Sequence, residues 1–538
     1  MMPSDARPVD HAEAGGHALR LWSAAVRQLP LDRDWRLLVA LSVLCVAAAA
    51  MRFSSLRISR NEDDGFAARR QVRAVLGSAA LHRRAATLRP EARSPTSREL
   101  GVCLGRSRGV QCWASIEDSV MVVGPPRSGK GMHLAIPMIL DAPGAVITTS
   151  TRPDNLATTL RSRVEIGPTA IFDPQRLAAS LDSRLRWSPV RGCEDPAVAM
   201  TRARALCADA ANGVTEATFW QQQAVTATRC LLHAAALAER KTVDLLRWSL
   251  SVHAAQQAVD ILASHPAAAQ TWTKALDGIL DADPRQRDAV WATVANVFSA
   301  LSDPTVLDAL SPGPGEHFDP AQFLQERGTL YLIGTASGAA ATATMVAAFV
   351  EDVIDAAKRQ AARSPGGRLD PPLALVLDEA ANYPLPSLPS LMSDGGGAGI
   401  STTVILQSLA QARSRWGPQD AAAIWDSAII KVVLGGLTNA SDLSDISGLT
   451  GKRTERQCSE SRGPDGRRSI STSTHDVATM DVGQLRTLPF GRALLLPRST
   501  APLILDLRPW TKRRDAARIQ EHRAGIERQL RTGSKADG

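Results

Sequence analysis

Residues 124–132 combine small residues with one lysine in an order that can bind phosphate. They read Gly124, Pro125, Pro126, Arg127, Ser128, Gly129, Lys130, Gly131 and Met132. Glycines allow a tight turn in which backbone N–H groups converge on an oxyanion, and a lysine can reach the outer phosphates of a nucleotide. A strand-like run precedes this loop and a helix-like stretch follows it, as such a loop requires. The segment therefore predicts a nucleotide-binding loop, with Lys130 as its catalytic cation.

Gly131 departs from the usual pattern of such loops. A Ser or Thr hydroxyl normally stands at this position and ligates Mg²⁺. Two interpretations remain open from the loop alone. Either the metal relies on water and a carboxylate elsewhere, or the site is impaired.

Two adjacent acids follow a second strand-like run, Leu373–Leu377. A parallel sheet brings the carboxyl ends of its strands to one edge, so we expect Asp378 and Glu379 to lie beside the loop. We expect Asp378 to hold Mg²⁺, directly or through water, and Glu379 to polarise the attacking water. Paired acids are also common on surfaces, and it is their combination with the phosphate-binding loop that favours an active ATPase.

Gln407 follows a third apolar run, residues 402–406. An amide at this position can contact both the γ-phosphate and the attacking water, which would pass the state of hydrolysis to the segment that follows. A glutamine after a strand can also simply begin a helix. Ring-forming ATPases often need an arginine from the neighbouring subunit, and the sequence leaves three candidates open: Arg413, Arg415 and Arg453.

The elements that must position these residues follow an α/β pattern. Short apolar, β-branched runs alternate with helical stretches, which predicts a parallel-rich sheet covered on both faces. The six runs lie at 119–123, 145–149, 329–333, 373–377, 402–406 and 429–433. Between 194 and 312 no such run occurs and the spacing is helical, so we expect an all-helical domain inserted into an NTPase core made of residues 98–193 and 313–508.

The N-terminal segment, residues 1–54, contains a candidate membrane span at 35–53. Fifteen uncharged residues at 37–51 are flanked by Trp35 and Phe53, which suit a bilayer interface. Nine arginines in residues 52–90, against five in residues 1–36, predict a single-pass protein of the cell membrane with its ATPase domain in the cytoplasm. The alternative is a buried, alanine-rich soluble helix.

The remaining segments are polar. Residues 55–97 are predicted to be a basic linker, residues 452–475 a surface hairpin, and residues 509–538 a basic polar tail. We expect the tail to be a solvated helix, and a contact with a partner or nucleic acid is the alternative. The seven cysteines show neither C-x-x-C pairs nor zinc-ligand spacing, which fits a reducing cytoplasm.

The amino-acid composition is compatible with an anionic partner but does not identify one. The chain has 538 residues, 44% of them hydrophobic and 22% charged, which excludes wholesale disorder. Its net charge of +8 favours an anionic partner such as nucleic acid or an acidic membrane. The same arginine and alanine usage would also follow from a GC-rich genome.

Taken together, the motifs of this chain resemble those of one family, the TraG/TraD-type coupling proteins of conjugation and type IV secretion. The likeness runs from about 98 to 508, and glycine after the loop lysine is frequent in that family. Where many members have Asp-Pro-Lys-Gly after the strand that corresponds to residues 145–149, this chain reads Thr149 to Asp154. The alanine- and arginine-rich composition suggests an actinobacterial member. The motifs that carry the likeness are the loop 124–131, Phe219-Trp220, Leu377–Asn382, Leu406–Gln411 and Leu488–Leu496.

The resemblance implies a membrane-tethered, RecA-like ATPase that binds ATP and Mg²⁺ and forms a homo-hexamer. It further implies partners: relaxase-bound single-stranded DNA, relaxosome proteins docked through residues 194–312, the type IV secretion channel and the inner membrane. Two alternatives stay open. One is an FtsK-like double-stranded DNA translocase, and the other is a nucleotide-binding adaptor that docks secretion substrates with little turnover.

Overall fold

The computed structural model describes residues 65–173, 176–178, 180–181, 185–208, 217–334, 336–462 and 468–533. The predicted span at 35–53 lies outside these residues. Within them, no helix combines the length and the apolar character that crossing a membrane demands. The described residues divide into two units, a larger one within 66–452 and 478–533 and a smaller one that includes 453–462 and 468–477.

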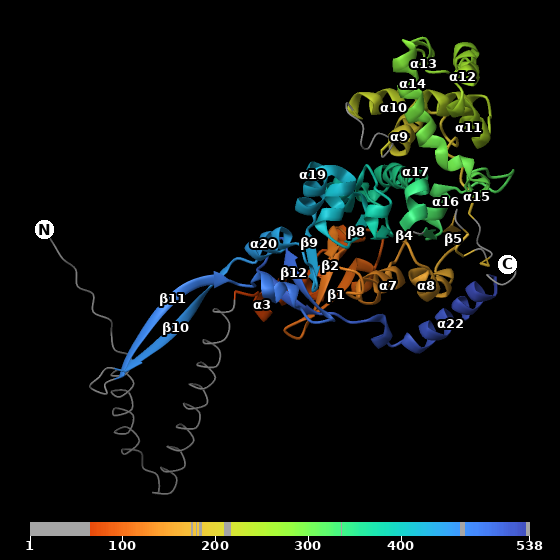
Figure 1. The fold of residues 1–538 in the computed structure, drawn as a ribbon. Coiled ribbons are helices and arrows are strands. Elements are labelled where there is room, and N and C mark those ends of the chain that lie inside the picture. The colour runs from red at the N-terminus through yellow and green to blue at the C-terminus, as the bar shows by residue number, and fades with distance from the viewer. Residues whose placement is uncertain are drawn as a thin grey trace, which may run out of the picture. The chain divides into compact units, whose positions relative to one another are not determined.

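A mixed sheet of eleven strands is the centre of the larger unit (Figure 1). Its order is β2-β1-β13-β12-β9-β3-β8-β7-β4-β6-β5. The seven strands from β9 to β5 are all parallel, and the four from β2 to β12 join one edge in antiparallel register. This is an α/β fold with a RecA-like core.

The six predicted strand runs are all present in the parallel part of the sheet. They are β3 (Val120–Val123), β4 (Val146–Ser150), β6 (Thr329–Ile333), β7 (Leu373–Asp378), β8 (Ile400–Leu406) and β9 (Ile430–Leu434). The sequence did not predict β1 (Gly101–Ser107), β2 (Val110–Ser115), β5 (Thr169–Phe172), β12 (Arg492–Pro497) and β13 (Leu503–Asp506). Several of these lie towards an edge of the sheet, where strands are short or only half apolar.

Two hydrophobic cores lie on the two faces of the sheet, because successive side chains of a strand point in opposite directions. In β3, Val120 and Val122 belong to one core while Met121 and Val123 belong to the other. The first core includes the helix α7 (Ile136–Asp141). Figure 1 shows α7 and α8 (Asp154–Val164) on one side and α17 (Ala336–Arg363) and α19 (Leu409–Ser427) on the other. Continuous apolar strands are thus explained by burial on both faces.

The chain leaves the sheet after β5 and returns at β6, and the described residues between 196 and 312 contain helices and turns but no strand. Several of these helices begin at an Asp-Pro pair, as at Asp195, Asp283 and Asp303, whose carboxylates accept backbone N–H bonds while proline takes the first helical position. Figure 1 shows α9–α14 as a cluster of helices. The helices of this stretch are α9 (Pro196–Leu206), α10 (Ala217–Leu237), α11 (Thr242–Leu250), α12 (Val252–Ser264), α13 (Trp272–Leu280), α14 (Pro284–Phe298) and α15 (Pro304–Ala309).

A buried ion pair ties the helical cluster to the core. Arg202 of α9 bonds to Asp352 of α17, and the indole N–H of Trp187 donates to the same carboxylate at 3.0 Å. The Trp187 ring also packs on Phe349, with ring centroids 5.1 Å apart. Because removing one partner would leave a buried charge unpaired, this contact fixes where the helical cluster joins α17.

The described part of the predicted linker is folded, so the linker interpretation of residues 55–97 is wrong for it. Residues 69–88 form α3 (Arg69–Leu76), α4 (Ser78–Arg83) and α5 (Ala85–Leu88), and α6 (Ser97–Leu100) follows. Val72 and Leu76 are buried in the core that also contains β1 and β2 residues. Apolar residues four apart mark one helix face, and the surrounding arginines concealed that pattern.

The expected solvated tail is also a packed helix, α22 (Ala516–Gly533). Ile519 is fully buried against Ile136 of α7 and Trp510. Two turns further on, Ile526 packs with Leu156 and Leu160 of α8. The seven-residue spacing of the two isoleucines puts them on one face of the helix. The C-terminal helix therefore covers α7 and α8.

The hairpin at 452–475 is present as a two-stranded sheet, β10 (Lys452–Arg462) and β11 (Arg468–Ala478). Thr454 donates to Asp476 across the strands at 3.1 Å. Most of this hairpin belongs to the smaller unit.

The packing of α22 gives a stability prediction. Ile519→Ala should lower the free energy of unfolding by about 2–4 kcal/mol, because it removes buried methyl groups and leaves a cavity beside α7. Urea denaturation followed by circular dichroism measures the change. The control Gln529→Ala, at an exposed position of the same helix, should stay within about 0.5 kcal/mol. Equal effects of the two variants would contradict the packed position of α22.

Candidate functional site

The loop 124–131 leaves the carboxyl end of β3 and turns into a helix. Gly124 donates its N–H to the Leu406 carbonyl of β8 at 3.1 Å, and a Cβ on Gly124 would lie 2.8 Å from Leu434 of β9. The start of the loop is therefore fixed between the two neighbouring strands. Pro126 and Arg127 are exposed at the tip of the loop.

Lys130 is buried and its ammonium group lies on the carbonyls of its own loop. Its Nζ is 2.5 Å from the Gly124 oxygen and 3.0 Å from the Pro125 oxygen. Burial lowers the pKa of Lys130, and the charges of Asp378 and Glu379 act in the opposite direction. The Ser128 hydroxyl donates to the Pro125 carbonyl at 2.7 Å and so tightens the same turn.

The turn into the helix requires a glycine at position 129. Gly129 has φ of 89°, and a Cβ there would lie 2.6 Å from the His133 ring. His133 lies in a π-helical turn, Gly131–Ala135, and its ring meets Phe490 edge-on with centroids 5.2 Å apart. Phe490 is 65% exposed. Short π-helical turns are frequent at functional sites.

Strand order brings the remaining predicted residues to the loop. Strand β8 lies between β3 and β7, so Gln407 at the end of β8 lies between the loop and the acids at the end of β7. The Gln407 amide donates to Glu379 Oε1 at 3.3 Å. The Gln411 side chain, from the first turn of α19, accepts the Gln407 backbone N–H. Lys130, Asp378, Glu379 and Gln407 therefore meet at one edge of the sheet.

Asp378 is placed where its negative charge is costly. Burial, and then the neighbouring charge of Glu379, raise its pKa to about 6, while Lys130 and Asn155 act in the opposite direction. Its carbonyl accepts the Thr149 hydroxyl of β4 at 2.8 Å, which fixes the end of β7. A group in this state gains from a cation beside it.

Glu379 is held by three donors in a strained backbone conformation. Its φ of 53° is in the left-handed region, which is uncommon for residues other than glycine and occurs often at active sites. One carboxylate oxygen accepts Thr151 at 2.6 Å and Asn382 at 3.1 Å, and the other accepts Gln407. These contacts fix the carboxylate that the sequence predicted as the catalytic base.

Asn155 is a site residue that the sequence did not predict. It lies in the first turn of α8, is 2% exposed, and its amide nitrogen is 3.4 Å from Asp378 Oδ2. Thr151, which contacts Glu379, comes from the same β4–α8 connection. The polar residues after the predicted strand 145–149 were the available signal, since residues that follow a parallel strand reach the ligand edge of the sheet.

Gly131 is not required by the backbone or by crowding. Beyond its chain neighbours and the local helix backbone, a Cβ at this position would meet only Asn155 Oδ1, at 3.8 Å, among the described residues. Met132, next along the chain, is partly buried against the cluster of Ile136, Trp510 and Ile519. The site therefore has room for a side chain where the usual hydroxyl would stand.

The three candidate arginines differ in their surroundings. Arg413 is bound within its own chain to the buried Asp442 of α20 (Ala440–Leu449), at 2.7 Å. Arg415 is exposed. Arg453 belongs to the smaller unit and lies 4.0 Å from Glu455. Arg413 is exposed as well, but Asp442 already holds its guanidinium, so Arg415 is the candidate of the larger unit that is exposed without that ion pair.

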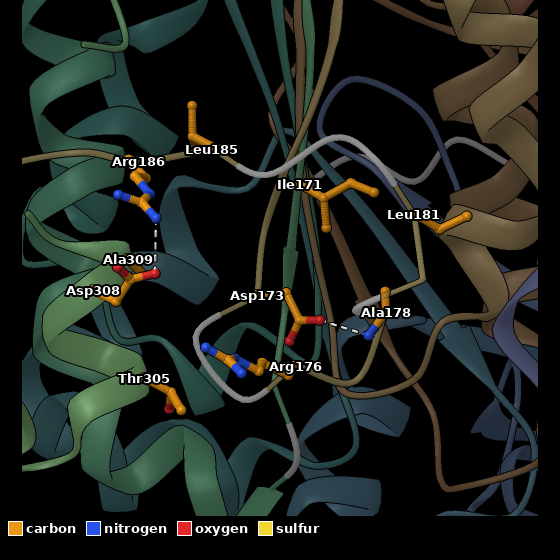
Figure 2. Close-up of a pocket in the computed structure, with 10 residues that line it drawn as sticks. All are labelled: Ile171, Asp173, Arg176, Ala178, Leu181, Leu185, Arg186, Thr305, Asp308 and Ala309. Atoms are coloured by element: carbon orange, nitrogen blue, oxygen red, sulfur yellow. Dashed lines mark hydrogen bonds and ion pairs between the residues drawn. The ribbon is translucent and has the colours of Figure 1, made fainter. Parts of the chain in front are cut away.

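Two cavities bear on the assignment. One of about 380 Å³ is bordered by Pro125, Gln407 and the loop Gly436–Asn439 after β9, and its size is within the range of small-molecule sites. The other, shown in Figure 2, lies at the end of β5 beside the Arg186–Asp308 ion pair. It measures only about 60 Å³, too little for a nucleotide, and contains none of the predicted residues.

The donors present fit Mg²⁺ better than a transition metal. Among the residues that the structure describes, no group of three or more His, Cys, Asp or Glu side chains could hold a metal. Mg²⁺ is usually bound by one or two carboxylates together with phosphate oxygens and water. Asp378, with the hard oxygens of its neighbours, meets that requirement.

A family model matches residues 372–490, and its description is "TraM recognition site of TraD and TraG". The matched segment includes Asp378, Glu379 and Gln407. No curated protein sequence matches the chain significantly.

Solved structures with the same fold include those of the coupling protein TrwB. Unbound TrwB, described as a bacterial conjugative coupling protein, is 16% identical with a TM-score of 0.56, and the match covers 80% of this chain and 92% of that one. The complex of TrwB with the ATP analogue ADPNP is 17% identical with a TM-score of 0.56, and the match has the same coverage of both chains. The complex of TrwB with ADP and Mg²⁺ is 17% identical with a TM-score of 0.55, and the match covers 81% of this chain and 93% of that one. The fold and the matched family segment together confirm the resemblance to TraG/TraD-type coupling proteins.

The pKa of Asp378 gives a prediction for the protein without nucleotide and metal. An acid whose pKa is higher in the folded than in the unfolded chain makes the folded state lose stability as the pH rises from about 4 to about 6. An asparagine side chain does not titrate, so Asp378→Asn should raise the free energy of unfolding at pH 7.5 by on the order of 1 kcal/mol, and by less near pH 4. Urea denaturation at the two pH values measures this.

Asp420→Asn, at an exposed position, is the control and should show no such pH-dependent gain. A stability of Asp378→Asn equal to or below that of the unmodified protein at pH 7.5 would contradict the buried, unneutralised state of Asp378.

Proposed function

We propose that this chain is a membrane-anchored, ATP-hydrolysing coupling protein that recruits relaxase-bound DNA and helps to move it during conjugation. The observation that carries the proposal is the meeting of Lys130, Asp378, Glu379 and Gln407 at the ligand edge of a sheet with the TrwB fold. A cation, a metal-binding carboxylate, a fixed base and an amide are the parts that phosphoryl transfer to water needs.

In the proposed reaction the loop amides and Lys130 bind the phosphates of ATP. Lys130 is already buried at the loop, so phosphate oxygens would replace the Gly124 and Pro125 carbonyls as its partners. Asp378 would hold Mg²⁺, which supplies positive charge to the β- and γ-phosphates when it is bound. That ligand set is supported by the TrwB complexes with ADPNP and with ADP and Mg²⁺.

Glu379 and Gln407 would act on the attacking water. Glu379 accepts the water proton, because its carboxylate is fixed by Thr151 and Asn382 on one oxygen. Gln407 donates to the other oxygen through its amide nitrogen, which leaves its amide oxygen to accept a hydrogen bond from the same water. Loss of the γ-phosphate would then change the contacts of Gln407 and be felt by α19.

The partners follow from the same resemblance. A TraM recognition site in the matched family supports a relaxosome partner. We further propose docking of relaxosome proteins on residues 194–312, a homo-hexameric ring, contact with the type IV secretion channel, and anchoring in the inner membrane through 35–53. The conjugative role of TrwB supports these assignments.

The central prediction concerns ATP turnover and DNA. The protein should hydrolyse ATP, and single-stranded DNA should stimulate the rate. Lys130→Ala should lower nucleotide affinity and turnover by about 10² or more, since it removes the charge that stabilises the transferring phosphoryl group. Glu379→Gln should bind ATP normally and lose about 10²- to 10⁴-fold in kcat, since only the base is removed. A coupled phosphate-release assay and fluorescent-nucleotide titration measure the two effects.

The alternatives give different results in the same assay. Stimulation by duplex DNA only would favour a double-stranded DNA translocase. Nucleotide binding without steady-state hydrolysis would favour the docking adaptor. Hydrolysis at the unmodified rate in both variants would rule out the site itself. Asp420→Asn is again the control and should hydrolyse ATP normally.

The exposure of Arg415 gives a prediction about subunit cooperation. Arg415→Ala should lower kcat by about 10² or more with little change in KM, because an arginine supplied to the neighbouring site stabilises transition-state charge. Arg413→Ala should act mainly on stability, because Arg413 is bound to Asp442 in its own chain. Mixing Arg415→Ala with Lys130→Ala subunits should restore hydrolysis, since each supplies what the other lacks. Absence of any rescue would exclude Arg415 as the arginine that acts between subunits.

A further inference from the structure

We propose that the amide oxygen of Asn155 is the metal ligand that replaces the hydroxyl missing at Gly131. The inference rests on the proposed function, because it concerns the Mg²⁺ that accompanies ATP. It assigns a role to a residue outside the loop, outside the β7 acids and outside the motifs that carry the family resemblance.

The position of Asn155 is the first observation. Its side chain is buried at the start of α8 and its Nδ2 is 3.4 Å from Asp378 Oδ2. A carboxylate oxygen only accepts hydrogen bonds when it is ionised, so the amide must present its nitrogen to Asp378. The orientation of the amide is therefore fixed, and its oxygen faces away from Asp378.

The direction in which that oxygen points is the second observation. Apart from the local helix backbone and the neighbouring residues Lys130 and Met132, Asn155 Oδ1 is the one heavy atom of the described residues within 4 Å of the place where a side chain at position 131 would begin, at 3.8 Å. A serine or threonine hydroxyl at 131 is one bond beyond that Cβ. The Asn155 oxygen thus borders the space that the usual metal-binding hydroxyl would fill.

The glycine itself is the third observation. Gly131 is in a helical turn, where glycine costs about 1 kcal/mol relative to alanine, and neither its φ nor its neighbours require it. An empty position at 131 leaves the Asn155 oxygen uncovered towards the phosphate site. A neutral, hard oxygen is also chemically equivalent to the hydroxyl that it replaces, since Mg²⁺ prefers such ligands and the charge of the site is unchanged.

The structure holds α8 firmly enough for such a role. Arg163 at the other end of the helix is fully buried and makes three hydrogen bonds of 2.7 Å, to Thr329 and to the carbonyls of Ala142 and Gly144. The packing of α22 against Leu156 and Leu160 covers the same helix. A ligand on a helix fixed at both ends is held with little freedom.

The test removes the amide oxygen of Asn155 and then supplies a hydroxyl oxygen at position 131 in its place. Mn²⁺, a spectroscopic substitute for Mg²⁺, is titrated by electron paramagnetic resonance into the full chain loaded with ADP. Asn155→Ala should weaken Mn²⁺ binding by about 10-fold or more, with the metal-free affinity for ADP unchanged. Asn155→Ala combined with Gly131→Ser should return Mn²⁺ affinity to within a few-fold of the unmodified protein. Asn296→Ala, an asparagine at an exposed position of α14, is the control and should leave Mn²⁺ affinity unchanged.

A second measurement needs no variant. Electron spin-echo modulation of Mn²⁺ in the unmodified, ADP-loaded protein should show the ¹⁴N coupling of a ligating carboxamide. Its absence, or Mn²⁺ affinity in Asn155→Ala within two-fold of the unmodified protein, would overturn the assignment. Either result, together with normal Mg²⁺-dependent hydrolysis that Lys130→Ala abolishes, would leave the proposed ATPase intact.

Discussion

Three charges held close together in a partly buried site are the constraint on which the rest of this structure depends. Lys130 lies on the carbonyls of its loop, and its charge interacts with Asp378 and Glu379 at the end of β7. One cation beside two carboxylates leaves a negative excess, and burial together with the charge of Glu379 raises the pKa of Asp378. Without a ligand such an arrangement costs stability, and a metal-bound nucleotide would relieve that cost because it adds a dication and phosphates that Lys130 can bind. The arrangement of these charges therefore favours the binding of a metal–nucleotide complex.

The fold serves to keep those charges together. One strand, β8, separates the loop strand β3 from the acid strand β7, and this spacing gives Gln407 its place between base and loop. The connection after β4 adds Thr151 and Asn155, which hold the two carboxylates from the other side. Helix α22 then covers the helices that carry the loop and Asn155. Segments at the ends of four strands, β3, β4, β7 and β8, thus converge on one edge of the sheet.

The sequence predicted the parts of the site that follow buried parallel strands. Such strands are continuous apolar runs, and the residues at their carboxyl ends stand out by type, as Lys130 and Asp378 do. Asn155 could not be predicted, because asparagine is common at the start of a helix. Only the folded structure brings it close to Asp378 and Gly131. The packing of α3 and α22 could not be predicted, because an arginine-rich composition conceals apolar pairs such as Val72 with Leu76. The predicted span at 35–53 stays a prediction.

The most direct test of a nucleotide site at this loop is the position of the Lys130 ammonium once a nucleotide is bound. A structure of the protein with ADPNP and Mg²⁺ measures it. We expect Nζ to leave the Gly124 and Pro125 carbonyls for the β- and γ-phosphates, with the metal at Asp378 and with Glu379 facing the γ-phosphate. A nucleotide bound elsewhere, or one bound at the loop while Lys130 keeps both carbonyl contacts, would contradict it.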